Sequence, residues 1–280
     1  MTPKILTEKQ ISEMIAKLCV RACCDLPQDV VDAICSAYER ESNAAAKNIL
    51  SQLIENQKMA RELMRPCCQD TGMTVVFIDM GNSVLVDGDL TRAVNDGVSR
   101  AYTDNYLRKS VLTAIERKNT GDNTPAVIHL STHVGSDMRI TVAPKGFGSE
   151  NMSRIAMLKP SQGIQAALDF VVETVKTAGA NPCPPVVVGV GIGGNFEECA
   201  LLAKKQLLRP LDSKNERAEL QAYEDELLRR INALGIGPMG LGGDTTALSV
   251  HVGEMHTHLA GFPVAVNIQC HACRHAEGVL

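Results

Sequence analysis

The first sixty-odd residues carry apolar side chains at the spacing of amphipathic helices. One such face consists of Ile11, Met14, Ile15, Leu18 and Cys19. Thr7 and Gln10 precede it with the spacing of a capping box, in which each residue bonds to the backbone of the other. Two more helices are predicted, one starting near Pro27 and one over about 43–63. Residues 1–66 are therefore predicted to form a helical N-terminal region.

From residue 74 the pattern changes to short β-branched runs separated by turn signals. Strand pairs are predicted at 74–80 with 83–86, turning at Gly81-Asn82, and at 126–133 with 138–143, turning at Gly135-Ser136. Single strands are predicted at 186–190 and 263–268, and helices at 90–107, 161–178, 196–208 and 213–234. Residues 119–125 are the best candidate for a surface loop. We predict a mixed α/β body over residues 67–280 that forms one continuous fold unit, so the fold class is α/β (mixed α+β).

The composition fits a globular protein of a reducing compartment. A formal net charge of −4 gives no support for a nucleic-acid partner or an anionic membrane partner. The chain shows no secretory signal and no apolar run near the roughly 18 residues of a membrane span. Ten cysteines without an export signal are more often metal ligands or reactive thiols than disulfides. We therefore expect a cytoplasmic protein.

Residues 189–194 form a formal G-x-G-x-x-G between a predicted strand and a predicted helix. The pattern is weak here, because no second parallel strand ending in an acidic residue follows about 20 positions later. The ordinary interpretation is a glycine-rich turn from strand to helix. A dinucleotide-binding oxidoreductase stays as a distant alternative.

The cysteines fall into two groups. Small buried side chains are the expected role of Cys19, Cys23, Cys24, Cys35 and Cys199, which lie in predicted helices. The remaining five lie on loops, in "RPCCQDTG" (Cys67, Cys68), "GANPCPPVV" (Cys183) and "NIQCHACRH" (Cys270, Cys273). Thiolates gathered from distant loops are typical of zinc or iron–sulfur sites. Adjacent cysteines suit two ligands of one tetrahedral metal poorly, so one ligand per loop is the simplest count.

Three ligands would leave one iron of a cluster open, and an open iron is a Lewis acid. A zinc-stabilised interaction or scaffold subunit without chemistry of its own is the rival interpretation. His256 and His258 lie shortly before the last thiol loop and are candidates to face the site. The ordinary interpretation of Arg108 is a solvent-exposed residue at the end of a helix.

Seven motifs together resemble one family. They are "CCQDTG", "LRKS", "PKGFGSENMS", "NPCPP", "GVGIGGNFEECALLAKKQLLRP", "GPMGLGGDTTAL" and "HTHLAGFPVAVNIQCHACR". In this order they are similar to the class I fumarase and L-tartrate dehydratase family of iron–sulfur hydro-lyases. The resemblance runs from about residue 5 to the end and matches the alpha portion of that family.

The resemblance implies a 4Fe-4S cluster with one open iron, held by Cys68, Cys183 and Cys270. It also implies substrate contacts from Gln69, Asp70, Arg108, Gly148 and His258, with Asp70 and His258 as catalytic residues. Further basic and hydroxyl groups would come from a beta subunit that completes the active site, and the arrangement that the family implies is a heterotetramer. The implied reaction is the reversible addition or removal of water on a C4 dicarboxylate, with fumarate/L-malate as the first candidate and L-tartrate to oxaloacetate as the second.

Overall fold

The computed structural model describes residues 3–280, and the chain divides into two compact units. Unit 1 comprises the chain up to Pro27 together with Gln57–Phe147 and Arg274–Leu280, whereas unit 2 comprises Gln28–Asn56 and Gly148–Cys273. These boundaries differ from the predicted division at residue 66. Of the three predicted N-terminal helices, the first lies in unit 1, the second lies in unit 2, and the third runs from unit 2 into unit 1.

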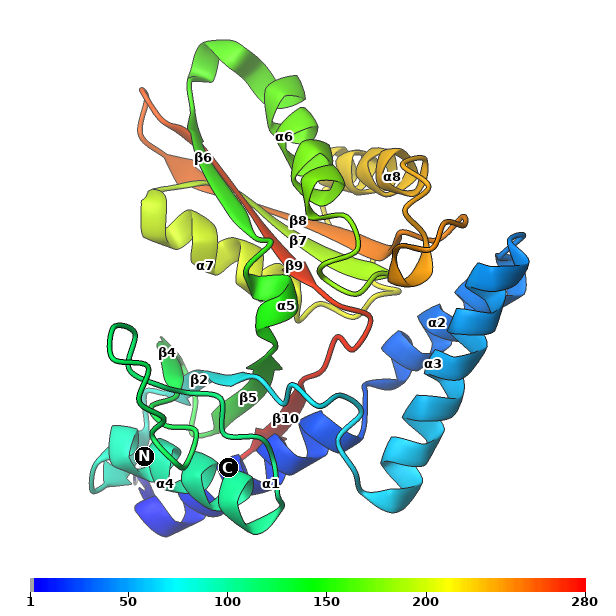
Figure 1. Cartoon of the computed structure of the whole chain (residues 1–280). Helices are drawn as coiled ribbons and strands as arrows, with labels where there is room; N and C mark the ends of the chain where they lie inside the picture. Colours follow the sequence, from blue (N-terminus) through cyan, green and yellow to red (C-terminus); the bar gives the residue numbers. More distant parts are fainter. Residues whose placement is uncertain (1–2) are drawn as a thin grey trace. The chain divides into compact units, whose positions relative to one another are not determined.

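Unit 1 is a four-stranded sheet with helices on one face. Its elements are β1 (Lys4–Thr7), α1 (Glu8–Cys24), β2 (Met73–Gly81), β3 (Val84–Asp87), α4 (Leu90–Asp104), β4 (Val127–His133), β5 (Met138–Lys145) and β10 (Ala276–Val279). The strand order is β10-β5-β2-β4, and α1 and α4 pack against each other and the sheet (Figure 1). The predicted capping box of Thr7 and Gln10 is present at the start of α1. Val76, Ile78 and Ile140 face the helices in one apolar core.

Both predicted strand pairs are wrong in their pairing, although the strands themselves form. β2 lies between β4 and β5, parallel to the first and antiparallel to the second. β3 pairs with β1 and not with β2. The α4 crossover makes the parallel β2–β4 pair possible, and this arrangement buries Val76 and Ile78 of the central strand against the helices. A short turn signal between two strands does not indicate whether those strands pair with each other or with strands elsewhere in the chain.

Unit 2 is a second four-stranded sheet, covered on both faces. Its elements are α2 (Gln28–Arg40), β6 (Arg154–Leu158), α6 (Gly163–Ala178), β7 (Val186–Gly194), α7 (Phe196–Gln206), α8 (Ala218–Asn232), β8 (Ala247–Thr257) and β9 (Phe262–Gln269). α3 (Ala44–Leu63) and α5 (Phe147–Glu150) span the unit boundaries. The strand order is β6-β9-β7-β8. α6 and α8 contribute to the apolar core on one face, and α7 packs on the other (Figure 1).

The glycine-rich run lies inside β7 and serves helix packing. A Cβ at Gly189 would stand 2.1 Å from the carbonyl oxygen of Ala203, and one at Gly191 would stand 2.4 Å from that of Cys199. Both carbonyls belong to α7, so only glycine permits this close approach of helix and strand. Because β7 pairs on both sides at these residues, they do not form the phosphate-binding turn of a dinucleotide site.

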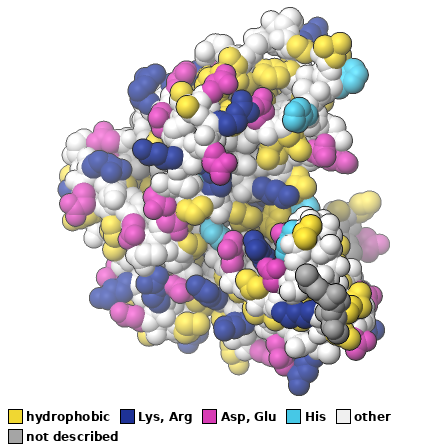
Figure 2. All heavy atoms as spheres, turned by 180° about the vertical axis from the view of Figure 1, so that it is seen from behind, with side chains coloured by type: hydrophobic (Ala, Val, Ile, Leu, Met, Phe, Trp, Pro, Cys, Tyr) yellow, Lys and Arg dark blue, Asp and Glu magenta, His cyan; other side chains and the backbone are white. Residues whose placement is uncertain are grey.

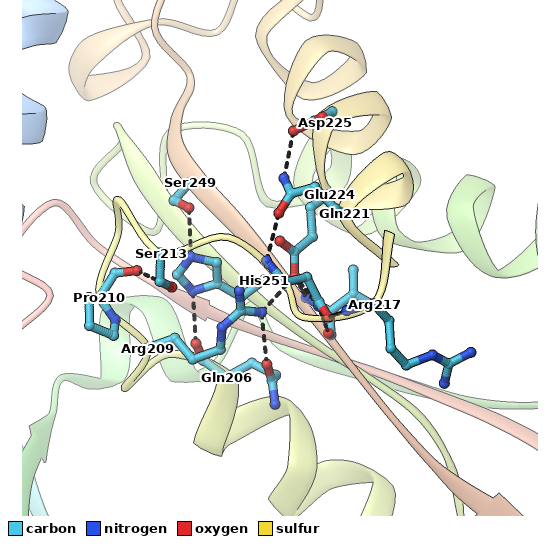
Figure 3. A network of polar contacts seen from close by, with 12 residues as sticks. Gln206, Arg209, Pro210, Ser213, Arg217, Gln221, Glu224, Asp225, Ser249 and His251 are labelled. Atoms are coloured by element: carbon cyan, nitrogen blue, oxygen red, sulfur yellow. Dashed lines mark hydrogen bonds and ion pairs between the residues drawn. The ribbon is translucent and has the colours of Figure 1, made fainter. Parts of the chain in front are cut away.

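His251 is a buried structural residue of β8 (Figure 3). Its Nδ1 lies 3.0 Å from the carbonyl oxygen of Gln206, which only accepts, so Nδ1 donates and Nε2 accepts from the Ser249 hydroxyl at 2.9 Å. Burial lowers the pKa of His251, with the nearby Arg209 as a further cause. The ring is therefore held neutral and joins the end of α7 to β8.

The surface of the described chain shows charges of both signs. Figure 2 shows Lys and Arg side chains interspersed with Asp and Glu on the face in view, with apolar side chains between them. Among the described residues, no helix combines the length and apolarity that crossing a bilayer requires. The face in Figure 2 has no single broad basic patch, in keeping with the net charge of −4.

Candidate functional site

In unit 1 the "CCQDTG" segment enters β2 beside the end of β5. Met73 pairs with Lys145, so the chain before β2 lies next to the chain that leaves β5. Asp70 joins the two: its Oδ2 accepts from the backbone N–H of Phe147 at 2.9 Å, and its Oδ1 from that of Gly72 at 3.0 Å. The carboxylate is half-buried and fixed in orientation by these two bonds.

Arg274 supports the same segment from the C-terminal end of the chain. Its guanidinium donates to the backbone carbonyls of Pro144 and Asp70, and the side chain is buried. Both acceptors are main-chain oxygens, so Arg274 ties the end of β5 to the Asp70 segment.

Arg108 lies close in the chain fold to the Asp70 segment. The Thr71 hydroxyl donates to the carbonyl oxygen of Arg108 at 3.1 Å, while the Arg108 side chain is exposed. Gln69 is exposed as well, and Cys68 is half-buried. Unit 1 thus brings together the backbones of four predicted site residues on one irregular stretch of surface.

In unit 2 the Cys183 and Cys270 loops meet at the edge of the sheet where β7 begins and β9 ends. Val187 near the start of β7 pairs with Gln269 at the end of β9. The carbonyl oxygen of Cys183 accepts from the backbone N–H of His271 at 3.4 Å, and the Nδ1 atom of His271 lies 3.2 Å from the same oxygen. Cys183 is exposed and Cys270 half-buried. Two accessible thiols therefore lie on joined loops.

The neighbouring thiols differ from the predicted ligands in burial. Cys67 is 8% exposed and its backbone N–H donates to the carbonyl of Cys23, and Cys273 is 3% exposed with its thiol directed at the carbonyl of Leu207. In each pair the residue predicted as ligand is the more accessible one. This favours Cys68 over Cys67 and Cys270 over Cys273.

The helix cysteines are buried packing residues, with the half-buried Cys35 as the exception. Burial raises the pKa of Cys23 to about 12 and the pKa values of Cys24 and Cys199 to about 11. Burial also raises the pKa of Cys19. Thiols in this state stay protonated at neutral pH and are poor metal ligands.

Gly148 and His258 occupy different ends of unit 2. Gly148 is exposed, and a Cβ there would meet only the carbonyl oxygen of Asn181, at 3.6 Å. His258 is exposed in the turn between β8 and β9, where its Nδ1 accepts from the N–H of Ala260. The eight residues of β9, roughly 26 Å of extended chain, separate that turn from Cys270. Within the unit, His258 is not brought to the thiols.

Sequence reasoning missed the side chains that hold the Asp70 segment. Asn123 is fully buried, donates to the carbonyl of Gly72 at 3.1 Å and accepts from Ser110 and Val111, so the predicted surface loop is partly interior. The buried Tyr102 hydroxyl donates to the Thr71 carbonyl at 2.7 Å. The Asn-Thr-Pro sequence at 123–125 is a turn signal, and nothing local in it indicates burial.

The donor set fits a cluster held by three thiolates. All ten cysteines are thiols and none is in a disulfide, and three accessible ones lie on irregular segments at strand ends. Cys68 belongs to unit 1, whereas Cys183 and Cys270 belong to unit 2. Across residues 3–280, no three side chains of His, Cys, Asp or Glu converge as a preassembled metal site. Soft thiolate donors are the ligands that iron–sulfur clusters use.

Comparison with known proteins gives one consistent result. The family model described as "Fumarate hydratase (Fumerase)" matches residues 12–279. A protein of Methanocaldococcus jannaschii, provisionally named L(+)-tartrate dehydratase subunit alpha, is 42% identical over 95% of this chain and 96% of its own length. The L(+)-tartrate dehydratase subunit alpha of Escherichia coli strain UTI89 is 33% identical over 97% of this chain and 90% of its own length.

Proposed function

The chain belongs to the fumarate hydratase family, and on this premise we propose that it is the alpha subunit of an iron–sulfur hydro-lyase acting on a C4 dicarboxylate. Fumarate/L-malate and L-tartrate are the substrates to be distinguished. The observation that carries the proposal is the accessible pair Cys183 and Cys270, whose loops His271 joins at one sheet edge.

Cys68, Cys183 and Cys270 are proposed to hold a 4Fe-4S cluster with three thiolates. When bound, the cluster supplies an open iron, a Lewis acid that polarises the C–O bond of the leaving hydroxyl. Half-buried to exposed thiols can reach such a group, whereas the raised pKa of Cys23 and Cys24 makes those thiols unsuited to it.

The chain's own polar residues bind and orient the substrate. Arg108 and Gln69 are exposed and present a cation and an amide to the carboxylates, and Gly148 offers its backbone. Asp70, fixed by the N–H groups of Gly72 and Phe147, takes the carbon-bound proton or orients the group that does so. Orientation by two backbone bonds is what a proton transfer in a defined direction requires.

A beta subunit is proposed to complete the site. Arg108 is the clearest cation among the proposed site residues, whereas Arg274 is committed to backbone carbonyls, and two substrate carboxylates need more positive charge. His258 is separated from Cys270 by the length of β9, so it can serve the same site only from a second alpha chain. This supports a heterotetramer built from two heterodimers.

The test is to co-express the chain with its separately encoded beta subunit and purify the complex without oxygen. Iron and acid-labile sulfide near four each per alpha chain, with dehydratase activity on L-malate or L-tartrate that is lost in air, would support the proposal. Assays on both substrates assign the specificity. Zinc without sulfide would contradict it and favour a zinc-stabilised scaffold, and full activity of the alpha chain alone would contradict the need for a partner.

A further inference from the structure

The turn that follows Gly148 is bonded to the strand that leads to Cys270. Glu150 uses both carboxylate oxygens in this connection: Oε1 accepts from Lys204 Nζ of α7 at 2.6 Å, and Oε2 accepts from Asn267 Nδ2 of β9 at 2.9 Å. Gly148 lies two residues before this carboxylate, and Cys270 three residues after Asn267. One carboxylate therefore links three segments of unit 2.

Ser153 closes the connection on the other side of the turn. Its Oγ accepts from Asn267 Nδ2 at 3.0 Å and from the backbone N–H of Ile268 at 3.1 Å. The backbone N–H of Ser153 donates to the carbonyl of Glu150 at 3.0 Å. Residues 150–153 are thus attached to β9 at two successive positions.

On the side that faces α7 and β9, polar bonds hold this turn, while Met152 of the turn packs against the apolar core of unit 2. A cavity of about 200 Å³ adjoins it, lined by polar or charged residues and by apolar residues of β6, α7 and β9; the polar or charged ones are Glu150, Ser153, Arg154, Lys204 and Asn267. The Lys204 and Glu150 side chains are 19% and 27% exposed, so water screens the pair less than a fully exposed one. Because the cavity leaves little packing on that side, loss of the carboxylate would release the turn.

We propose that Glu150, Lys204 and Asn267 are positioning residues that fix the backbone of Gly148 relative to the strand carrying Cys270. The inference rests on the proposed function, in which Gly148 contacts the substrate and Cys270 holds the cluster. A glycine can contact substrate only through its backbone, so the position of the turn sets the quality of that contact. The cluster thiols are untouched by the change.

The test compares Glu150→Ala with wild type in the alpha–beta complex. We expect KM for the dicarboxylate to rise on the order of tenfold, since a 1 Å misplacement can cost up to about 100-fold. The value of kcat should stay within about threefold, and iron and sulfide contents should not change. Hydrogen–deuterium exchange should increase in peptides covering residues 147–153 and 262–269, which is a readout independent of activity.

Two substitutions of Lys204 separate the effect of its charge, because Lys204→Met removes the charge and Lys204→Arg keeps it. Lys204→Met should raise KM and exchange as Glu150→Ala does, and Lys204→Arg should restore both toward wild type. The effect of the double variant Glu150→Ala/Lys204→Met should be smaller than the sum of the two single effects, because both changes remove the Lys204–Glu150 bond and only Lys204→Met also removes the longer bond to Asn267 Oδ1. If Glu150→Ala fails to assemble, the two Lys204 variants decide the question.

Asp169→Ala is the matched control. It breaks an ion pair of the same 2.6 Å length in unit 2, between α6 and Arg230 of α8, which touches neither the turn nor β9. It should leave KM and the exchange of both peptides unchanged. Wild-type KM and exchange in Glu150→Ala and Lys204→Met would overturn the inference, as would an equal effect of the control. A wild-type complex without cluster or activity would instead overturn the proposed function.

Discussion

The two units contain sheets with the same pattern of strand directions but different cover. In β10-β5-β2-β4 and in β6-β9-β7-β8, a central strand has a parallel neighbour on one side and an antiparallel one on the other, followed by a second antiparallel strand. In both, the start of the central strand lies beside the end of its antiparallel neighbour. Cys68 and Asp70 occupy that edge in unit 1, and Cys183 and Cys270 occupy it in unit 2.

The number of sheet faces covered by helices explains why the strands of the two units differ in their pattern of apolar and polar residues. β7 is buried along nearly all its length, because α7 covers one face and α6 and α8 the other. In unit 1 the helices cover one face, and the opposite face carries half-buried or exposed side chains such as Phe77, Asp79 and Ser131. The candidate site residues therefore lie at the same edge of both sheets, although one sheet has one covered face and the other has two.

The largest expected effect tests the equivalence of the two edges. Cys68→Ser, Cys183→Ser and Cys270→Ser should each lower cluster iron and activity at least about 100-fold, since even outer-shell changes typically cost 10–100-fold. Anaerobic iron and sulfide analysis measures this. The matched controls Cys67→Ser and Cys273→Ser change buried neighbours and should retain the cluster. Loss in a control with retention in its neighbour would reverse the assignment within that pair.

The next effect tests the two-sided cover of unit 2. Gly189→Ala should lower the free energy of unfolding by about 1–3 kcal/mol, because its Cβ would stand 2.1 Å from a carbonyl of α7. Ser131→Thr adds the same single carbon on the exposed face of unit 1 and should change it by less than about 0.5 kcal/mol. Urea unfolding monitored by circular dichroism compares them. Equal effects would mean that the two sheets are not covered differently.

A smaller effect tests how the edge of unit 1 is held. Tyr102→Phe removes the buried donor to the Thr71 carbonyl and should cost about 1–2 kcal/mol of unfolding free energy. Tyr223→Phe in unit 2 removes a hydroxyl whose bond to Glu219 is exposed, and its cost should fall within about 0.5 kcal/mol. Thermal unfolding of both variants measures the difference. A neutral Tyr102→Phe would show that the edge does not depend on this bond.

The smallest effect concerns pH, where one histidine in each unit should act in opposite directions. Burial lowers the pKa of His251, so the folded state resists its protonation and stability falls as the pH drops below the ordinary value near 6.5. The Asp137 hydrogen bond, with Asp79, raises the pKa of His133. That contribution is present at pH below about 6.5 and is lost as the pH rises through the raised pKa.

Unfolding measured between pH 5.5 and 8 separates the two. His251→Asn should flatten the loss of stability on the acid side, and His133→Asn should remove a contribution on that same side. Variants that shift stability equally at every pH would show that neither ring's titration is coupled to folding.

Sequence alone determined the elements whose signals are local. The helix after Thr7 followed from helical periodicity and its capping box, and the strands at 186–190 and 263–268 followed from short continuous apolar runs. The mixed α/β class followed as well. The motif loops identified three thiol-bearing segments with one expected ligand each, and the family resemblance singled out Cys68, Cys183 and Cys270.

Tertiary structure alone decided the partners of those elements. Strand pairing depends on which long-range arrangement buries the most apolar surface, so β2 separated the two strands that a turn signal had paired. The same packing placed Asn123 in the interior and buried Cys67 and Cys273 beside their accessible neighbours. Burial is a property of the whole assembly of segments, and adjacent cysteines in one loop carry no local sign of which thiol will reach the surface.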